Sequence, residues 1–362
     1  MGTPHGRSVG LRDVAAKAGV SVKTVSNVVN GYTHVSPAMR LRVQAALDEL
    51  EYRPNISARH LRQGRTGLLA LAVPELDFPY FAALANVVVH AAERRGWTVL
   101  IEQTSGDPDR ERAVLAGIRS LRVDGIIFSP ISLLDDELRK RTDPTPMVLL
   151  GERAVAAPVH HVSVDNIGAS REATEHLIGL GARRIATIGH EPRLRGTGTL
   201  RLQGYLEALR AAGITPDPAL IAETDGYHRE EGARAMRELL ARAEPPDAVF
   251  AFNDLLALGA LREAVDQGLR VPEDLRIIGF DDIEECRYSC PRLSSVRPDL
   301  DLLADTALDR IASSLADGLP DPDALETQVS HQVVARESTV GRPTDQQPDQ
   351  SAARRPKGQR RR

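Results

Sequence analysis

The stretch SVKTVSNVVNG, residues 21–31, has the pattern of a short helix that starts at a serine and ends at an Asn-Gly pair. Val25, Val28 and Val29 recur at the spacing of one helix face. The other positions are polar and hold Lys23, Thr24, Ser26 and Asn27. A helix of about two and a half turns is only marginally stable alone. We therefore expect it to pack on neighbouring helices and to use its polar face for another purpose.

Two further helices are predicted around this stretch. The first ends at Gly19, and the third starts at Ser36-Pro37, a capping residue followed by a proline at the first helical position. Their apolar stripes are Leu11, Val14, Ala15 and Ala18, and Val43, Ala46, Leu47 and Leu50. The connecting turn AGVS, residues 18–21, is short and contains glycine, as a helix-turn-helix requires. We predict a helix-turn-helix domain over residues 1–54 with a small shared core.

A hinge is expected after this domain. Arg53-Pro54 breaks the helical pattern, and the polar segment NISARHLRQG, residues 55–64, then offers one or two helical turns. Such a segment is too short to be helical alone. We interpret residues 55–66 as a hinge helix or linker.

From Leu68 onward, apolar runs of strand length alternate with amphipathic helices, which is typical of an α/β fold with parallel sheets covered on both faces. The predicted strands are 68–73, 97–102, 124–129, 147–150, 162–164, 184–189, 247–252 and 275–280. The predicted helices are 80–95, 109–121, 168–180, 201–212, 231–242 and 254–267. About 270 residues are many for one sheet, so we expect residues 67–340 to form two lobes.

The charges are unevenly distributed along the chain. Residues 1–66 hold ten Lys and Arg against four Asp and Glu, and residues 341–362 hold seven against two. Since the whole chain carries −4, the remaining 274 residues carry −15. A basic head on an acidic body suggests that the head binds an anionic polymer. Residues 341–362 have almost no apolar side chains and are expected to form a disordered basic tail.

Several classes of protein are disfavoured by composition. The sequence has no run of about 18 apolar residues and no apolar secretion signal at its start, so we expect no membrane partner and a cytoplasmic, nucleoid-associated location. Cys286 and Cys290 are the only cysteines, which suits a reducing compartment. Their spacing supplies too few ligands for zinc. We expect no metal and no other cofactor.

The order of head, hinge and alternating body resembles the lactose-repressor/galactose-repressor (LacI-type) family of bacterial transcription regulators. The resemblance covers about residues 9–340. It rests on the motifs LRDVAAKAGVSVKTVSNVVNG, YRPNISARHLR, SVDNIGAS, GARRIATIGH, FAFNDLLALGAL, IIGFDD and VARESTV in this order and spacing. The family's fold implies a three-helix DNA-binding domain and a body like that of periplasmic sugar-binding proteins.

This resemblance implies that residues 22–29 are a recognition helix laid in the DNA major groove. Lys23 can donate to guanine, Asn27 can pair with adenine, and Val22 can touch a thymine methyl group. Phosphate contacts position the helix without specifying a sequence. The residues expected to make them are Ser21, Thr24 and Ser26.

In the hinge, Leu61 matches the family's leucine that wedges between base pairs in the minor groove. Ala58 leaves room for close approach, and Arg59 is a candidate phosphate contact. Because the wedge works in pairs, the resemblance implies a homodimer on a pseudo-palindromic double-stranded operator.

The body's resemblance implies a small-molecule effector between two lobes, beyond the carboxyl ends of the strands. The candidate effector-binding residues are Tyr80, Phe81, Arg195, Thr197, Arg201, Tyr227, Asn253 and Asp281; Asp77 lies in the same segment as Tyr80. Aromatic faces combined with bidentate charged groups suit a sugar or a nucleobase.

The class of effector stays open between two alternatives. Where many relatives place an aspartate after the strand 147–150, this chain has Gly151-Glu152-Arg153, so one ligand anchor is lost or shifted. Arg195 and Thr197, with Tyr80-Phe81, are similar to the purine repressor, which would make a purine the corepressor. A sugar or sugar derivative is favoured because it is the family's commonest effector class.

Two other functions compete with a ligand-controlled repressor. A sugar-binding protein without a regulatory role would share the body but would not carry residues 1–66. An enzyme would need a nucleophile and base, and no such pair is found; we assign no catalytic residue. Asp281 and Asp282 are interpreted as strand neighbours that point to opposite faces, so they cannot act as a facing acid pair.

Overall fold

The computed structural model describes residues 9–29, 32, 34–50, 52, 65–118, 122–133, 135–151, 159–191, 196–318 and 326–342. They belong to two compact units, Met1–Gly67 and Leu68–Arg362. Within these described ranges, no helix is both long and apolar enough to cross a membrane.

The first unit holds three helices, α1 (Leu11–Ala18), α2 (Val22–Val29) and α3 (Pro37–Glu49). Their caps agree with the sequence: Gly19 ends α1 with a φ of 62°, and the hydroxyl of Ser36 accepts a hydrogen bond from the backbone of Met39. A shared core joins the helices and consists of Val14, Ala15, Ala18, Val25, Val28, Val43, Ala46 and Leu47. The predicted helix-turn-helix arrangement is confirmed.

The second unit contains two six-stranded sheets, ordered β11-β5-β4-β3-β1-β2 and β12-β10-β9-β8-β6-β7. The strands of the first sheet are β1 (Leu68–Val73), β2 (Thr98–Gln103), β3 (Gly125–Phe128), β4 (Met147–Leu150), β5 (His160–Val164) and β11 (Glu326–Val329). Those of the second are β6 (Ile185–His190), β7 (Ile221–Glu223), β8 (Ala248–Ala251), β9 (Arg276–Phe280), β10 (Ser294–Pro298) and β12 (His331–Val334). Each sheet is the centre of one lobe.

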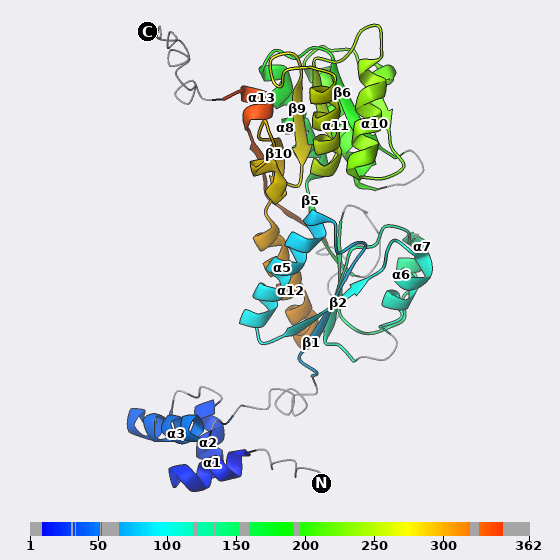
Figure 1. The fold of residues 1–362 in the computed structure, drawn as a ribbon. Coiled ribbons are helices and arrows are strands. Elements are labelled where there is room, and N and C mark those ends of the chain that lie inside the picture. The colour runs from blue at the N-terminus through cyan, green and yellow to red at the C-terminus, as the bar shows by residue number, and fades with distance from the viewer. Residues whose placement is uncertain are drawn as a thin grey trace, which may run out of the picture. The chain divides into compact units, whose positions relative to one another are not determined.

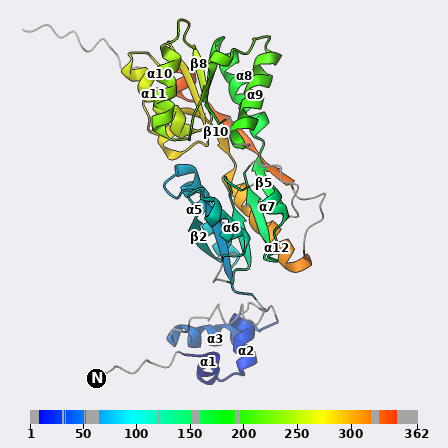
Figure 2. The ribbon, with the colours of Figure 1, turned by 90° about the vertical axis from the view of Figure 1, so that its right-hand side faces the viewer.

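Both sheets are covered on both faces, which explains their apolar central strands. In the first lobe α5 (Pro79–Arg94) and α12 (Leu300–Asp317) cover one face, and α6 (Pro108–Leu115) and α7 (Asp135–Arg139) the other (Figure 1). In the second lobe α8 (Asn166–Gly179) and α9 (Thr197–Ala211) lie opposite α10 (Arg229–Leu240) and α11 (Asp254–Asp266) (Figure 2). The second lobe also contains the short helices η1 (Pro218–Leu220), η2 (Glu284–Arg287) and α13 (Glu337–Val340).

The chain crosses between the lobes at three places, from β5 to α8, from β10 to α12 and from β11 to β12. Two of these crossovers are joined directly, because the backbone N–H of Asp299 donates to the carbonyl of Ser330 at 3.0 Å. After Pro298 the chain returns to the first lobe, where it forms α12.

Several predicted details need correction. The helix expected over 109–121 ends at Leu115, where Gly117 takes a φ of 84°. The sheets are not wholly parallel, since β10 and β12 pair antiparallel. The strands β7, β10, β11 and β12 and the helix α12 were not predicted. The four strands are short or rich in polar residues, and all lie at or next to a sheet edge, so they lack the continuous apolar pattern of a central strand.

Candidate functional site

The polar face of α2 is available for contact. Ser21, Val22 and Lys23 are exposed, and Thr24, Ser26 and Asn27 are half-buried. Val22 is 42% exposed although it is aliphatic, so the core does not require a valine there. On the opposite side of the helix, Val25 and Val28 are buried in the shared core.

Contacts around α2 fix how this face is presented. The Ser21 hydroxyl accepts a hydrogen bond from the backbone N–H of Thr24 at 3.1 Å, as an N-cap does. Arg42 of α3 donates to the carbonyl of Gly19 at 3.2 Å, which ties α3 to the turn before α2. The hinge residues Ala58, Arg59 and Leu61 lie outside the described residues, so their predicted roles stay predictions.

The second unit has a cavity of about 490 Å³ between its lobes, a size usual for small-molecule sites. The first lobe contributes the loop after β1 and the loop after β3. The second lobe contributes the ends of β6, β7, β8 and β9 and the start of α9 and α10. The walls therefore form beyond the carboxyl ends of parallel strands, where ligands of open α/β sheets bind.

Arg201 is the most constrained charged residue of this cavity. Its Nε donates to Asn166 Oδ1 at 2.6 Å, and its Nη1 donates to the carbonyl of Phe252. The guanidinium also lies 3.6 Å from the ring centroid of Phe280, a cation–π contact. These three partners leave Nη2 facing Asp281, whose Oδ1 is 4.0 Å away.

Aromatic rings form the opposite wall. Phe78 and Tyr80 flank Phe81, with ring centroids 5.6 and 5.2 Å apart from it. Across the cavity, His228 of the second lobe approaches Phe78 edge-on at 5.9 Å and lies 3.6 Å from Glu75 in an ion-pair geometry. Rings of this kind can stack on the apolar face of a flat or ring-shaped ligand.

Tyr227 and Asn253 are tied to each other. The Asn253 side chain donates to the Tyr227 carbonyl at 3.0 Å and accepts from the backbone N–H of Leu256 at 2.9 Å, capping α11. The Tyr227 hydroxyl lies against Gly198, where a Cβ would stand 2.6 Å from it. The Tyr227 backbone is thus held by the capping side chain of Asn253. Its hydroxyl occupies space that is open because Gly198 has no side chain.

Two family models match the chain. One, described as "Bacterial regulatory proteins, lacI family", covers residues 10–55, and one, described as "Periplasmic binding protein-like domain", covers residues 174–339. The HTH-type transcriptional regulator CelR of Thermobifida fusca is 40% identical over 311 residues, which are 81% of this chain and 88% of CelR. The chain belongs to the lacI family of bacterial regulatory proteins.

Solved structures of lacI-family regulators agree with this assignment. The transcriptional regulator CelR in complex with cellobiose is 35% identical with a TM-score of 0.65, covering 91% of this chain and 99% of that one. The Lac repressor dimer bound to operator and the anti-inducer ONPF is 27% identical with a TM-score of 0.73, covering 92% and 99%. This lacI-family chain is a DNA-binding transcription regulator with an effector-binding domain, and not an enzyme.

Seven of the eight residues predicted to contact the effector line the cavity of this lacI-family regulator: Tyr80, Phe81, Thr197, Arg201, Tyr227, Asn253 and Asp281. The eighth, Arg195, lies outside the described residues. Asp77 is exposed and is not among the lining residues. Gly151, the first residue after β4, lines the cavity with a φ of 102°. Glu152 and Arg153 lie outside the described residues.

Several lining residues were missed by the sequence analysis: Glu75, Phe78, Ser129, Pro130, Ile131, Glu191, Asp225, His228 and Glu231. Most of them follow the ends of β1, β3, β6 and β7, so their positions after strands were the signal that could have found them. Burial, together with the nearby charge of Asp225, raises the pKa of Glu191. In the ranges that the structure describes, no three His, Cys, Asp or Glu side chains are placed to hold a metal ion.

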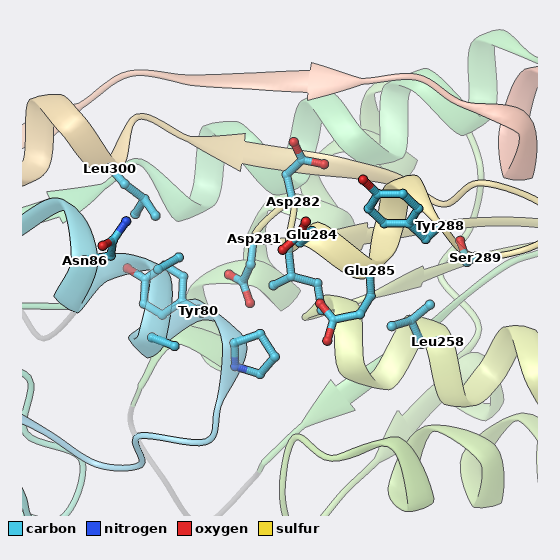
Figure 3. A pocket seen from close by; sticks show the side chains of 14 residues that line it. Tyr80, Asn86, Leu258, Asp281, Asp282, Glu284, Glu285, Tyr288, Ser289 and Leu300 are labelled. Atoms are coloured by element: carbon cyan, nitrogen blue, oxygen red, sulfur yellow. The ribbon is translucent and has the colours of Figure 1, made fainter.

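A second hollow of about 900 Å³ lies beside this cavity (Figure 3). It is lined by the first turns of α5, by Leu258 of α11 and by the segment 281–289. Tyr80 and Asp281 line both spaces. Tyr288 on its rim is 77% exposed, an unusual fraction for an aromatic ring. We call this hollow the α5–α11 groove.

Proposed function

We propose that this regulator is a transcriptional repressor whose operator affinity is set by a sugar or sugar derivative bound between the lobes. The observation that carries the proposal is the pairing of aromatic rings on one wall with the Arg201 and Asp281 side chains on the other. A pyranose has apolar ring faces that stack on aromatic side chains and hydroxyls that bond to charged groups.

The 4.0 Å separation between Arg201 Nη2 and Asp281 Oδ1 supports this class of ligand. The two atoms are too far apart for a direct hydrogen bond, and the gap between them is wide enough for a ligand hydroxyl to come between them. A hydroxyl can accept from the guanidinium and donate to the carboxylate at the same time. The complex of the relative CelR with cellobiose makes cellobiose the first compound to test.

For the DNA-binding unit we propose that Lys23, Asn27 and Val22 contact base edges in the major groove. Ser21, Thr24 and Ser26 are proposed to contact phosphates. These six residues are exposed or half-buried on one side of the helix, whereas Val25 and Val28 are buried on the other, and this arrangement supports the proposed roles. On the resemblance alone, Leu61 and Ala58 are proposed to bind the minor groove and Arg59 to contact a phosphate.

We further propose domains over residues 1–54, 55–66, 67–340 and 341–362. The boundary between the two structural units, at residues 67 and 68, supports the start of the effector domain. A nucleoid-associated location in the cytoplasm is proposed from the DNA-binding function.

The regulator is proposed to act as a homodimer that uses the α5–α11 groove. The groove exposes small residues of α5, Ala82 and Ala83, that allow close approach of a second copy. Light scattering of the full chain at micromolar concentration should give a dimer. Ala83→Glu adds a like charge beside Glu284 and Glu285 and should shift the protein toward monomer. An unchanged dimer in this variant would place the interface elsewhere.

The effector class is tested by isothermal titration of the full chain with cellobiose, other disaccharides, a purine base and a sugar phosphate. We expect saturable binding of an uncharged sugar and no binding of the purine. Binding of the purine with no sugar bound would contradict the proposal and favour the alternative of a purine corepressor.

A further inference from the structure

Asp281 and Asp282 are neighbours in sequence whose carboxylates point to opposite sides of their loop (Figure 3). The interpretation that they lie in a strand is wrong, because β9 ends at Phe280 and both residues have a positive φ, 108° for Asp281 and 52° for Asp282. Residues other than glycine adopt such angles at a cost and keep them only where the surroundings impose them. The loop must therefore be held from outside.

Three successive backbone N–H groups of this loop are bonded. Asp281 donates to the carbonyl of Val296 at 2.8 Å, and Asp282 donates to the hydroxyl of Ser295 at 3.0 Å. Both acceptors belong to β10. The loop that carries Asp281 is consequently fastened to the strand that leads into a crossover between the lobes.

Asp254 fastens the next residue. Its Oδ2 accepts from the backbone N–H of Ile283 at 2.9 Å, and its Oδ1 accepts from the Ser295 hydroxyl at 2.7 Å. The carboxylate is wholly buried and occupies the space beside Gly279, where a Cβ would stand only 2.1 Å from Oδ1. Gly279 in the motif IIGFDD is thus needed for this close approach.

The carboxylate of Asp282 supplies the last connection. Its side chain is 1% exposed, and its Oδ2 accepts from Arg297 Nε at 2.5 Å. Its Oδ1 lies 2.5 Å from Arg336 Nη2, in an ion pair rather than an aligned hydrogen bond. Burying an unpaired carboxylate costs free energy. The ion pairs with Arg297 and Arg336 therefore hold Asp282 and these two arginines together.

One arginine lies in a strand that adjoins a crossover, and the other lies just beyond a second such strand. Arg297 lies in β10, one residue before that strand ends at Pro298, and Arg336 lies two residues after the end of β12, as the N-cap of α13. Beyond Arg297, Asp299 donates from its backbone to the Ser330 carbonyl at 3.0 Å, and the Ser330 hydroxyl donates to Asp299 Oδ2 at 3.3 Å. One carboxylate therefore contacts β10 and the segment that follows β12, and each of these two antiparallel strands adjoins a crossover to the first lobe.

We propose that Asp282 is a positioning residue that couples the effector residue Asp281 to the two crossover strands through Arg297 and Arg336. The inference rests on the proposed function, since it takes Asp281 to be an effector contact. A ligand that shifts Asp281 moves the loop, and the ion pairs pass that shift to β10 and β12, where the relative placement of the lobes is set.

The test uses Arg297→Gln, because Arg297 is 42% exposed and the substitution leaves Asp282 paired with Arg336. Arg297→Lys keeps a charge and should restore most of the coupling. The matched control is Arg237→Gln, which removes an exposed arginine of the same lobe from its bond to Glu263, between α10 and α11.

The first measurement is hydrogen exchange of the ligand-free full chain. In Arg297→Gln, exchange should become at least about fivefold faster both at residues 281–283 and at residues 299–300 and 330–331. The control should leave both regions unchanged. Unchanged exchange in the Arg297→Gln protein, or faster exchange confined to residues 281–283, would overturn the inference.

The second measurement is operator affinity with and without cellobiose. Wild type should change its affinity by a factor in the range of about five to 150, whereas Arg297→Gln should change it less than about twofold, with equal affinity in the absence of sugar. An equal response in wild type and Arg297→Gln would also overturn the inference. If wild type does not respond to any sugar, the proposed function fails, and hydrogen exchange still decides the inference.

Discussion

Nη2 of Arg201 and Oδ1 of Asp281 lie 4.0 Å apart, and both side chains are almost fully buried. Opposite charges at this distance in a buried site attract each other strongly but do not form a direct hydrogen bond. Arg201 cannot move closer to Asp281 because its Nε is hydrogen-bonded to Asn166 and its Nη1 to the Phe252 carbonyl. We propose that a bound ligand bridges the two side chains.

Arg201→Lys should weaken sugar binding, because an ammonium cannot keep the bonds to Asn166 and Phe252 and the contact with Phe280 together. We expect a 10- to 100-fold increase in Kd, about 1.4 to 3 kcal/mol, by isothermal titration. Operator affinity without sugar should stay within about twofold of wild type. Arg184→Lys, in the same lobe but bonded to Glu244 and Pro245, is the control. Equal Kd values for all three proteins would show that Arg201 does not contact the ligand.

Gly198→Ala should displace Tyr227 from the cavity, because the new Cβ would stand 2.6 Å from the tyrosine hydroxyl and 3.1 Å from the Gly189 carbonyl. We expect about a tenfold loss of sugar affinity, or 1.4 kcal/mol. Gly179→Ala, in α8 of the same lobe, is the control, since its Cβ would meet no atom within 4 Å and Gly179 is not among the lining residues. If both variants bind sugar equally well, Tyr227 is not part of the binding wall.

The free energy of unfolding should fall as the pH rises, because the buried carboxyl group of Asp254 loses its proton. Burial raises the pKa of this carboxyl from 3.8 to about 7, so the folded state binds the proton more tightly than the unfolded state. The resulting stabilisation is complete below the unfolded pKa and is lost as pH rises through the folded one. Between about pH 5 and pH 8, wild type should lose on the order of a few kcal/mol relative to Asp254→Asn, measured by urea unfolding. Parallel pH profiles for the two proteins would contradict this.

Asn27→Ala should lower affinity for the preferred operator by about 1–3 kcal/mol and flatten the base preference at one position of each half-site. Gln44→Ala, on α3 and bonded to Asp48, should leave the preference intact. The measurement is binding-site selection from a random library. A consensus from the Asn27→Ala protein that equals the wild-type consensus would refute base reading by this residue.

The sequence alone was sufficient where local patterns decide the structure. Valines at helical spacing and the Ser21 cap predicted α2, and apolar runs predicted β1 and β4 at their observed bounds. The motif FND placed Asn253 at the start of α11, and the resemblance placed Arg201 and Asp281 in one cavity. Short-range signals and a family pattern carried these predictions.

The rest depends on contacts between distant parts of the chain. The helix α12 returns to the first lobe, where Asp305 pairs with Arg95 at 2.7 Å, 210 residues away in sequence. Similarly, the ring of Phe280 under Arg201 and the approach of His228 to Glu75 join segments that no periodicity relates. Polar edge strands such as β11 become strands only because a neighbouring strand offers its backbone.

A sugar held by Asp281 is proposed to change the operator affinity of the regulator. The most direct measurement is operator affinity by fluorescence anisotropy, with and without the sugar that binds in titration, for wild type and for Asp281→Ala. Wild type should shift by a factor in the range of about five to 150, and Asp281→Ala should bind operator with unchanged affinity and not respond to sugar. A response of wild-type size in Asp281→Ala would contradict the account, because the effector would then act from another site.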